Sequence, residues 1–133
     1  MFEHKAKTLS GEWVYGSYIK RYKNMKSIAQ DIATHWILPF NKNKKVQIDP
    51  ATLSLYSGRK DVNEQKIYSG DIIKLGSSNG LAVVEFLATT GFFLRLKKHG
   101  RRATFAYVGK ANKVMGNIMD NPELMSKLAY GDN

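Results

Sequence analysis

The clearest structural signal of the chain lies in residues 66–86, KIYSGDIIKLGSSNGLAVVEF. Two apolar runs flank the glycine- and serine-rich residues 76–80, and this pattern is typical of two β-strands joined in a hairpin. The loop lacks the Lys-Ser/Thr pair of a phosphate-binding loop, and no helix is expected after it. In the turn before the first strand, we expect Gly70 to allow the sharp bend and Asp71 to accept backbone N–H groups. These residues predict a hairpin that builds a core rather than a loop that binds a ligand.

The rest of the sequence alternates short apolar or aromatic segments with turn residues, which is typical of small β-sandwiches and barrels. Residues 25–33 fit either a helix or a strand followed by a turn. A helix start is well marked only at Asn121, an expected N-cap that Pro122 follows. We therefore expect a mainly β (α+β) chain that forms a single domain. Its predicted parts are an N-terminal β extension (1–54), a small SH3-like β-barrel (55–119) and a short C-terminal helix (120–130).

The net charge is the strongest feature of the composition. Twenty-one Lys and Arg residues stand against eleven Asp and Glu, which gives +10, and residues 86–119 contain seven basic and no acidic residues. Such a surface attracts polyanions and favours nucleic acid as a partner. The chain has no cysteine, which excludes disulfides and thiolate chemistry and suits a reducing cytoplasm. No apolar run is long enough to span a bilayer and no signal peptide is recognisable, so we expect no membrane association.

Two groups of cations are candidates for contacts with phosphates. One is the basic turn expected at residues 97–102, and the other follows the aromatic strand at residues 20–26, where a tyrosine among the cations suits base stacking. Exposed charge that keeps the protein soluble and strand edges apart explains both groups as well. The predicted nucleic-acid-binding residues are Lys20, Arg21, Lys23, Arg95, Lys97, Lys98, Arg101 and Arg102.

Aromatic side chains and strand edges bear on packing and assembly. We expect the aromatic residues to be core or subunit contacts rather than nucleotide platforms; they are Trp13, Tyr15, Trp36, Phe92, Phe93 and Phe105. A small open sheet has edges that need a partner or a cover. The apolar face formed by Leu124, Met125 and Leu128 must also be buried against something. Both features favour a homo-oligomer.

No pattern in the sequence indicates catalysis. His4, His35 and His99 are far apart and have no metal-binding spacing, and no serine lies in a nucleophile-elbow motif. We therefore expect no catalytic residue, no metal site, no cofactor and no enzymatic activity. The remaining alternative is a metal-dependent hydrolase, built from carboxylates that the fold would have to bring together. The candidates for that site are Asp61, Asp71 and Glu85.

Four segments carry a resemblance to a known family. They are Gly11-Glu12-Trp13-Val14-Tyr15-Gly16; Ile48-Asp49-Pro50-Ala51-Thr52-Leu53 with Tyr56-Ser57-Gly58-Arg59-Lys60-Asp61; Lys66-Ile67-Tyr68-Ser69-Gly70-Asp71-Ile72-Ile73; and Val114-Met115-Gly116-Asn117-Ile118 with Asn121-Pro122-Glu123-Leu124. In order and spacing they resemble the YopX family of small proteins encoded by phages and prophages. The chain departs from the family at residues 63–65, where a glycine is common, and at Ser69, where a carboxylate is common.

The resemblance implies a phage or prophage origin and a location in the cytoplasm of a bacterial host cell. It implies no activity and no catalytic residues, because the family has no established biochemical function. Charge and resemblance together predict a small non-enzymatic protein that acts as a basic nucleic-acid-binding module. The alternative is a self-assembling accessory protein that binds a host or phage protein.

Overall fold

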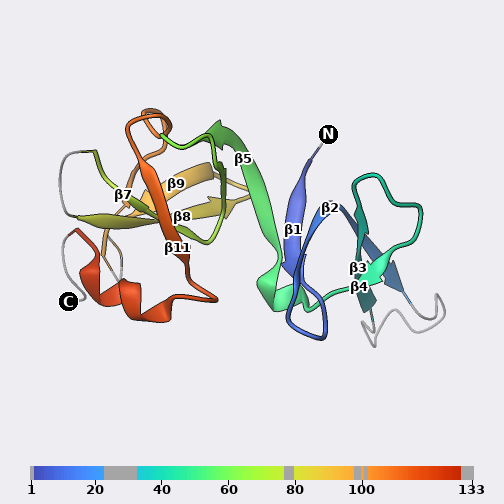
Figure 1. The fold of residues 1–133 in the computed structure, drawn as a ribbon. Helices are drawn as coiled ribbons and strands as arrows, with labels where there is room; N and C mark the ends of the chain where they lie inside the picture. Colours follow the sequence, from blue (N-terminus) through green and yellow to red (C-terminus); the bar gives the residue numbers. More distant parts are fainter. Residues whose placement is uncertain (1, 23–32, 77–79, 98–99, 101, 130–133) are drawn as a thin grey trace. The chain divides into compact units, whose positions relative to one another are not determined.

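The computed structural model describes residues 2–22, 33–76, 80–97, 100 and 102–129. The chain divides into two compact units, Met1–Leu55 and Tyr56–Asn133, which are described separately (Figure 1). Both are built from antiparallel strands, so the expectation of a mainly β fold is confirmed. Several predictions fall outside the described residues: the helix or strand at 25–32, the loop at 77–79, the tip of the basic turn at 98, 99 and 101, and the helix end at 130.

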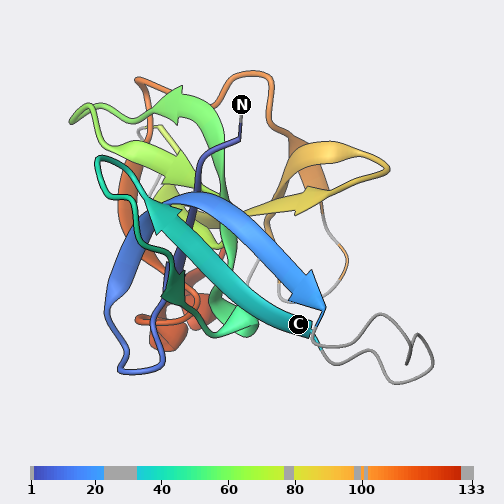
Figure 2. The ribbon, with the colours of Figure 1, turned by 90° about the vertical axis from the view of Figure 1, so that its right-hand side faces the viewer.

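The first unit is one antiparallel sheet in the order β4-β3-β2-β1-β5. Its elements are β1 (His4–Lys7), β2 (Trp13–Tyr22), β3 (Ala33–Pro39), β4 (Val46–Gln47), the 3-10 helix η1 (Pro50–Thr52) and the start of β5 (Ser54–Lys60). The longest ladder joins β2 to β3, which run side by side in Figure 2. The chain after β4 connects the ends of two strands, because Ile48 N donates to His35 O (2.9 Å) and Asp49 N donates to Lys7 O (2.9 Å).

One face of this sheet holds the core of the first unit. Ala6, Ile37 and Ile48 are almost fully buried, and Val14 and Tyr18 pack against them. Because side chains alternate between the two faces of a strand, the residues next to these in β2 and β3 lie on the opposite face.

The second unit is organised around a five-stranded sheet in the order β10-β9-β8-β7-β11. The strands are β7 (Asp71–Lys74), β8 (Leu81–Leu87), β9 (Gly91–Arg95), β10 (Arg102–Thr104) and β11 (Lys113–Asn117); β6 (Lys66–Tyr68) pairs with the second part of β5. The predicted hairpin is confirmed, since β7 pairs with β8 in the register Ile73↔Ala82. Gly70 has a φ of 89° and Asp71 Oδ2 accepts from Tyr68 N (2.8 Å), so the predicted turn roles are also confirmed.

Buried side chains lie on both faces of this sheet. One cluster includes Ile67, Ile73, Val84 and Phe105, and the other is formed by Ile72, Leu81, Val83 and Leu128. The outermost strands, β10 and β11, do not pair with each other within the described ranges. The sheet is therefore open, and the structure does not show the expected closure into an SH3-like barrel.

Two side chains tie the loops of the second unit to its strands. Arg59 Nη1 donates to the carbonyl oxygens of Phe105 (2.5 Å), Ala106 (2.9 Å) and Val108 (3.0 Å). Asn112 accepts from Gly109 N (2.9 Å) through Oδ1 and donates to Lys74 O (3.1 Å) through Nδ2. These bonds hold the irregular segment between β10 and β11 against β5 and β7.

The C-terminal segment differs from the expected helix over 120–130. Of the residues that the structure describes in this segment (120–129), only η2 (Pro122–Lys127) is helical, and it is a 3-10 helix. Asn121 does not cap it; its Oδ1 instead accepts from Asn117 N (3.2 Å), in the turn that follows β11. Among the described residues, no helix has the length and apolar character required to cross a membrane.

The apolar residues of this segment are buried within the second unit. Leu128 is 4% exposed, and Leu124 and Met125 pack against the same cluster as Ile72 and Val83. Ala129 N donates to Leu81 O (2.9 Å), which fixes the segment beside β8. This apolar face is therefore covered by its own unit and does not itself argue for a second subunit, and the homo-oligomer stays a prediction.

Candidate nucleic-acid interface

The β9–β10 hairpin brings two of the predicted cations together. Arg95 and Arg102 are direct partners across the ladder. Arg95 Nε lies 2.6 Å from Glu85 Oε1, so this carboxylate compensates its charge. The guanidinium of Arg102 lies 4.5 Å from the ring centre of Phe93, and its side chain is exposed. Lys97, just after β9, is half-buried, whereas Lys98 and Arg101 lie outside the described residues.

The predicted cations of the first unit lie at the end of β2. Lys20 and Arg21 are exposed, and Lys23 lies outside the described residues. Lys20 is opposite His35 and Arg21 is opposite Thr34, so the two charges point to opposite faces of the sheet. The structure therefore does not gather them into a single patch on one face.

The outer face of the first sheet carries a group of aromatic and apolar side chains. The ladder between β2 and β3 places Ile19 opposite Trp36 and Ser17 opposite Leu38, on the face away from the core. Trp13, Ile19, Trp36 and Leu38 are half-buried, and Tyr15 is 45% exposed. We call this surface the tryptophan face; it consists of Trp13, Tyr15, Ile19, Trp36 and Leu38, with the lysines that cover them.

The position of the tryptophans changes the expectation drawn from the sequence. Neither Trp13 nor Trp36 belongs to a buried core cluster of the described residues, so a core role was wrong for both, and a subunit contact stays a prediction. Phe93 and Phe105 are buried, and Phe92 packs against the cluster of Phe105, so the core role of these three is confirmed.

Lysine side chains lie over both tryptophan rings. The Nζ atoms of Lys5 and Lys7 are 4.5 and 5.5 Å from the ring centre of Trp13, and Lys45 Nζ is 4.7 Å from that of Trp36. At such distances the ring attracts the cation. Strands β1 to β4 contain four Lys or Arg residues and no Asp or Glu. In β1, cations stand at alternate positions, Lys5 and Lys7. The residues opposite them in β2 are aromatic, Tyr15 and Trp13. This shared alternation is the sequence signal that could have revealed the face.

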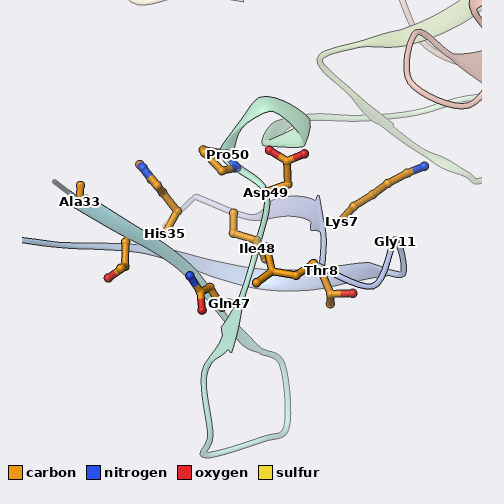
Figure 3. Close-up of a pocket in the computed structure, with 11 residues that line it drawn as sticks. Lys7, Thr8, Gly11, Ala33, His35, Gln47, Ile48, Asp49 and Pro50 are labelled. Atoms are coloured by element: carbon orange, nitrogen blue, oxygen red, sulfur yellow. The ribbon is translucent and has the colours of Figure 1, made fainter.

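Two hollows open on the first unit. One, of about 480 Å³, lies on the tryptophan face; its lining is Ile19, Trp36, Leu38, Asn43, Lys44 and Lys45. The other, of about 500 Å³, is drawn in Figure 3. There the side chains of Lys7, His35 and Asp49 point in different directions and do not converge on one point. Asp49 Oδ1 accepts from Ala51 N (3.0 Å), and His35 Nδ1 is hydrogen-bonded to Tyr18 OH (2.6 Å). These polar groups thus serve the fold of the unit.

The three carboxylates of the alternative hydrolase site each have a separate environment. Asp71 accepts from the turn at Tyr68, and Glu85 pairs with Arg95. Asp61 is fully buried in the loop between β5 and β6. Among the described residues, no group of three His, Asp or Glu side chains is placed to hold a metal ion.

The hydrogen bonds of Asp61 determine its ionisation. Its Oδ1 accepts from Asn63 N (2.8 Å) and Gln65 N (2.9 Å), and its Oδ2 accepts from Val114 N (2.9 Å). Burial by itself raises the pKa of the Asp61 carboxyl. The three backbone donors and the nearby Lys113 ammonium outweigh this effect, so the pKa lies below its ordinary value. Asp61 is therefore a charged structural residue that holds β11 to the loop after β5.

A sequence profile described as YopX protein matches residues 6–126. The match includes all four of the segments that carried the resemblance, and the chain belongs to the YopX family. No curated protein matches the chain. Among solved structures, it is similar to the crystal structure of protein EF1440 from Enterococcus faecalis, with a TM-score of 0.56 and 16% identity. That alignment covers 94% of this chain and 98% of the other, and at this identity it shows the fold alone.

Proposed function

We propose that the chain is a small non-enzymatic binding module whose partner is nucleic acid. The observation that carries this proposal is the sheet of the first unit, in which β1 to β4 contain four Lys or Arg residues and no Asp or Glu. Lys20 and Arg21 are exposed, on opposite faces of the sheet, whereas Lys5 is only 8% exposed. A polyanion is the partner that such a sheet attracts, and phosphate contacts supply most of the affinity of non-specific nucleic-acid binding.

Each unit also carries exposed cations besides the lysines of the tryptophan face. Lys20 and Arg21 in β2, and Arg102 in β10, have exposed side chains that are suited to phosphate contacts. Arg95 contributes less, because Glu85 already compensates its charge. A phage or prophage origin and a cytoplasmic location in a bacterial host belong to the proposal. The proposal also includes that the second unit is related to SH3-like barrels. The turn at Gly70, which directs β7 and β8 into one core, supports this relation.

Titration of the full chain against labelled duplex and single-stranded DNA and RNA, at low and moderate salt, tests the proposal. We expect binding that weakens steeply with salt, and a slope of log K against log salt that falls by about 0.7–0.9 for each phosphate contact removed. The double variant Lys20→Gln/Arg21→Gln should lower this slope, whereas Lys127→Gln, an exposed cation on η2, serves as the matched control. Absence of binding at low salt would contradict the proposal, since phosphate contacts are strongest there.

A second candidate function is a self-assembling accessory protein that binds a host or phage protein. It is supported by exposed apolar side chains at the end of β8, where Phe86 is 40% and Leu87 is 43% exposed, and by the open edge of β10. Light scattering of the purified chain, and capture from nuclease-treated host lysate, distinguish the two functions. The accessory function is favoured if the chain forms a stable oligomer and the variant Phe86→Ser/Leu87→Ser does not. The nucleic-acid-binding function is favoured if the chain is a monomer and binds nucleic acid but captures no protein.

A further inference from the structure

We propose that the tryptophan face binds an unpaired polynucleotide strand, with bases stacked on Trp36 and Trp13 and phosphates held by the neighbouring lysines. This inference rests on the nucleic-acid function proposed above and names the form of nucleic acid and the surface that holds it.

The Trp36 ring is prepared for stacking. Its Nε1 donates to Thr34 Oγ1 (2.9 Å), and this bond to a residue two positions earlier in β3 fixes the orientation of the indole. The ring forms one wall of the 480 Å³ hollow, between the apolar side chains of Ile19 and Leu38 and the loop that carries Lys44. This hollow is open to solvent, so a base can approach the ring from outside.

Lys45 gives this site a way to exchange partners. In the structure its ammonium lies over the Trp36 ring, 4.7 Å from the centre. Lys45 and Trp36 are both half-buried, and a contact between a lysine and a ring is in general weaker than the stacking of a base on an aromatic side chain. A base can therefore replace the ammonium on the ring. The displaced Lys45 ammonium can then contact the phosphate of the same nucleotide, and such a contact contributes to affinity by releasing counterions.

The length of the face suits a strand rather than a single nucleotide. Trp36 is opposite Ile19, six residues along β2 from Trp13. At about 3.3 Å per residue, the two rings are roughly 20 Å apart along the strand. Tyr15 lies between them on the same face. At the far end, Lys7, which is half-buried, and Lys5, which is only 8% exposed, lie over Trp13. This span suits several successive nucleotides, as on other sheet platforms for single strands.

The charge of the face also selects among possible occupants. The strands β1 to β4 that carry this face contain Lys and Arg but no Asp or Glu, so the faces of two copies of the chain would offer each other like charges. A duplex satisfies the cations, but its base faces are covered by base stacking and cannot reach the rings. Only an unpaired strand supplies both phosphates and open base faces.

The intrinsic fluorescence of the chain tests the inference directly, because its two tryptophans are both on this face. We expect a twelve-nucleotide oligothymidylate or oligouridylate to quench the emission and to bind more tightly than a duplex of the same length. Trp36→Leu should weaken binding of the single strand roughly 10- to 100-fold, whereas Trp36→Phe, which keeps a ring, should retain most of the affinity. Tyr107→Leu, which alters an exposed aromatic residue of the second unit, is the matched control.

The outcomes separate this inference from the function on which it rests. Binding of nucleic acid at low salt without quenching, or with equal affinity for duplex and single strand, overturns the inference and leaves the proposed function in place. No binding of any probe at low salt removes both. If circular dichroism shows that Trp36→Leu does not fold, the variant Lys45→Gln replaces it in the test. A smaller slope of log K against log salt for the single strand supports the inference, and an unchanged slope overturns it. Self-association that depends on Trp36 and excludes the single strand also overturns it.

Discussion

At the scale of single residues, the polar groups of the family segments act mainly as substitutes for backbone hydrogen-bond partners. Asp61 accepts three backbone N–H groups, Asp71 accepts from Tyr68 N, and Asn121 accepts from Asn117 N at the end of β11. Each of these side chains fixes a loop that has no ladder of its own. The segments that identify the family are thus, at these positions, requirements of its fold.

Asp61→Asn should destabilise the second unit. An amide retains one acceptor oxygen, but its NH2 group would face the N–H of Val114 and leave that buried donor without a partner. We expect a loss of about 3 kcal/mol in the free energy of unfolding, measured by urea denaturation. Glu123→Gln, an exposed carboxylate on η2, should change it by less than about 0.5 kcal/mol. A loss as small as that of the control would show that the three bonds contribute little.

Asp61 also predicts how stability depends on pH. Its pKa is lowered from 3.8 in the folded chain, so the folded state binds fewer protons at this site than the unfolded state. The stabilisation is fully present above the unfolded pKa and is lost as the pH falls below about 4 and through the folded pKa. The difference in unfolding free energy between the native chain and Asp61→Asn should therefore shrink in acid. Denaturation at a series of pH values measures it, and a constant difference would contradict the assignment.

At the scale of elements, the β2–β3 ladder sets both the core and the tryptophan face of the first unit. Gly16 is buried at the point where this ladder ends, opposite Pro39. A side chain there would collide with the carbonyl of Leu38 and would lie 2.8 Å from Pro39 Cα. Because these are backbone atoms, the strands would have to separate to admit even a methyl group.

Gly16→Ala should consequently cost about 3 kcal/mol of unfolding free energy, the upper end of the usual cost of overpacking. Ser17→Ala, one residue further along β2, is the control and should cost less than about 1 kcal/mol. Thermal unfolding followed by far-ultraviolet circular dichroism measures both. Equal stability of the two variants would mean that the ladder adjusts freely around residue 16.

Some elements could be predicted from the sequence and others could not. The β7–β8 hairpin was predictable because its strands are apolar on both faces and its turns carry glycine. The outward position of Trp13 and Trp36 was not predictable. Alternating side chains identify the two faces of a strand, but they do not show which face the rest of the chain covers. The role of Asn121 was missed for a different reason. An asparagine side chain that could cap a helix can also accept a hydrogen bond from the backbone of the residues before it. Only the tertiary contacts of the asparagine decide between these two roles.

At the scale of the whole molecule, the two units each have their own buried clusters. We expect Gly16→Ala to reduce amide protection mainly within residues 1–55, and Asp61→Asn mainly within residues 56–133. Hydrogen exchange measured by mass spectrometry on peptides from each unit tests this. Equal loss of protection in both units, from either substitution, would show that they unfold as one cooperative body.

The contacts of Arg59 have a practical consequence for handling the protein. A chain with twenty-one Lys and Arg residues offers trypsin many places to cut. The guanidinium of Arg59, however, is engaged by three carbonyl oxygens, so the protease cannot seat this side chain in its specificity pocket while they hold it. Cleavage after Arg59 thus reports the release of the segment that follows β10, and a time course of digestion would reveal that release without any label.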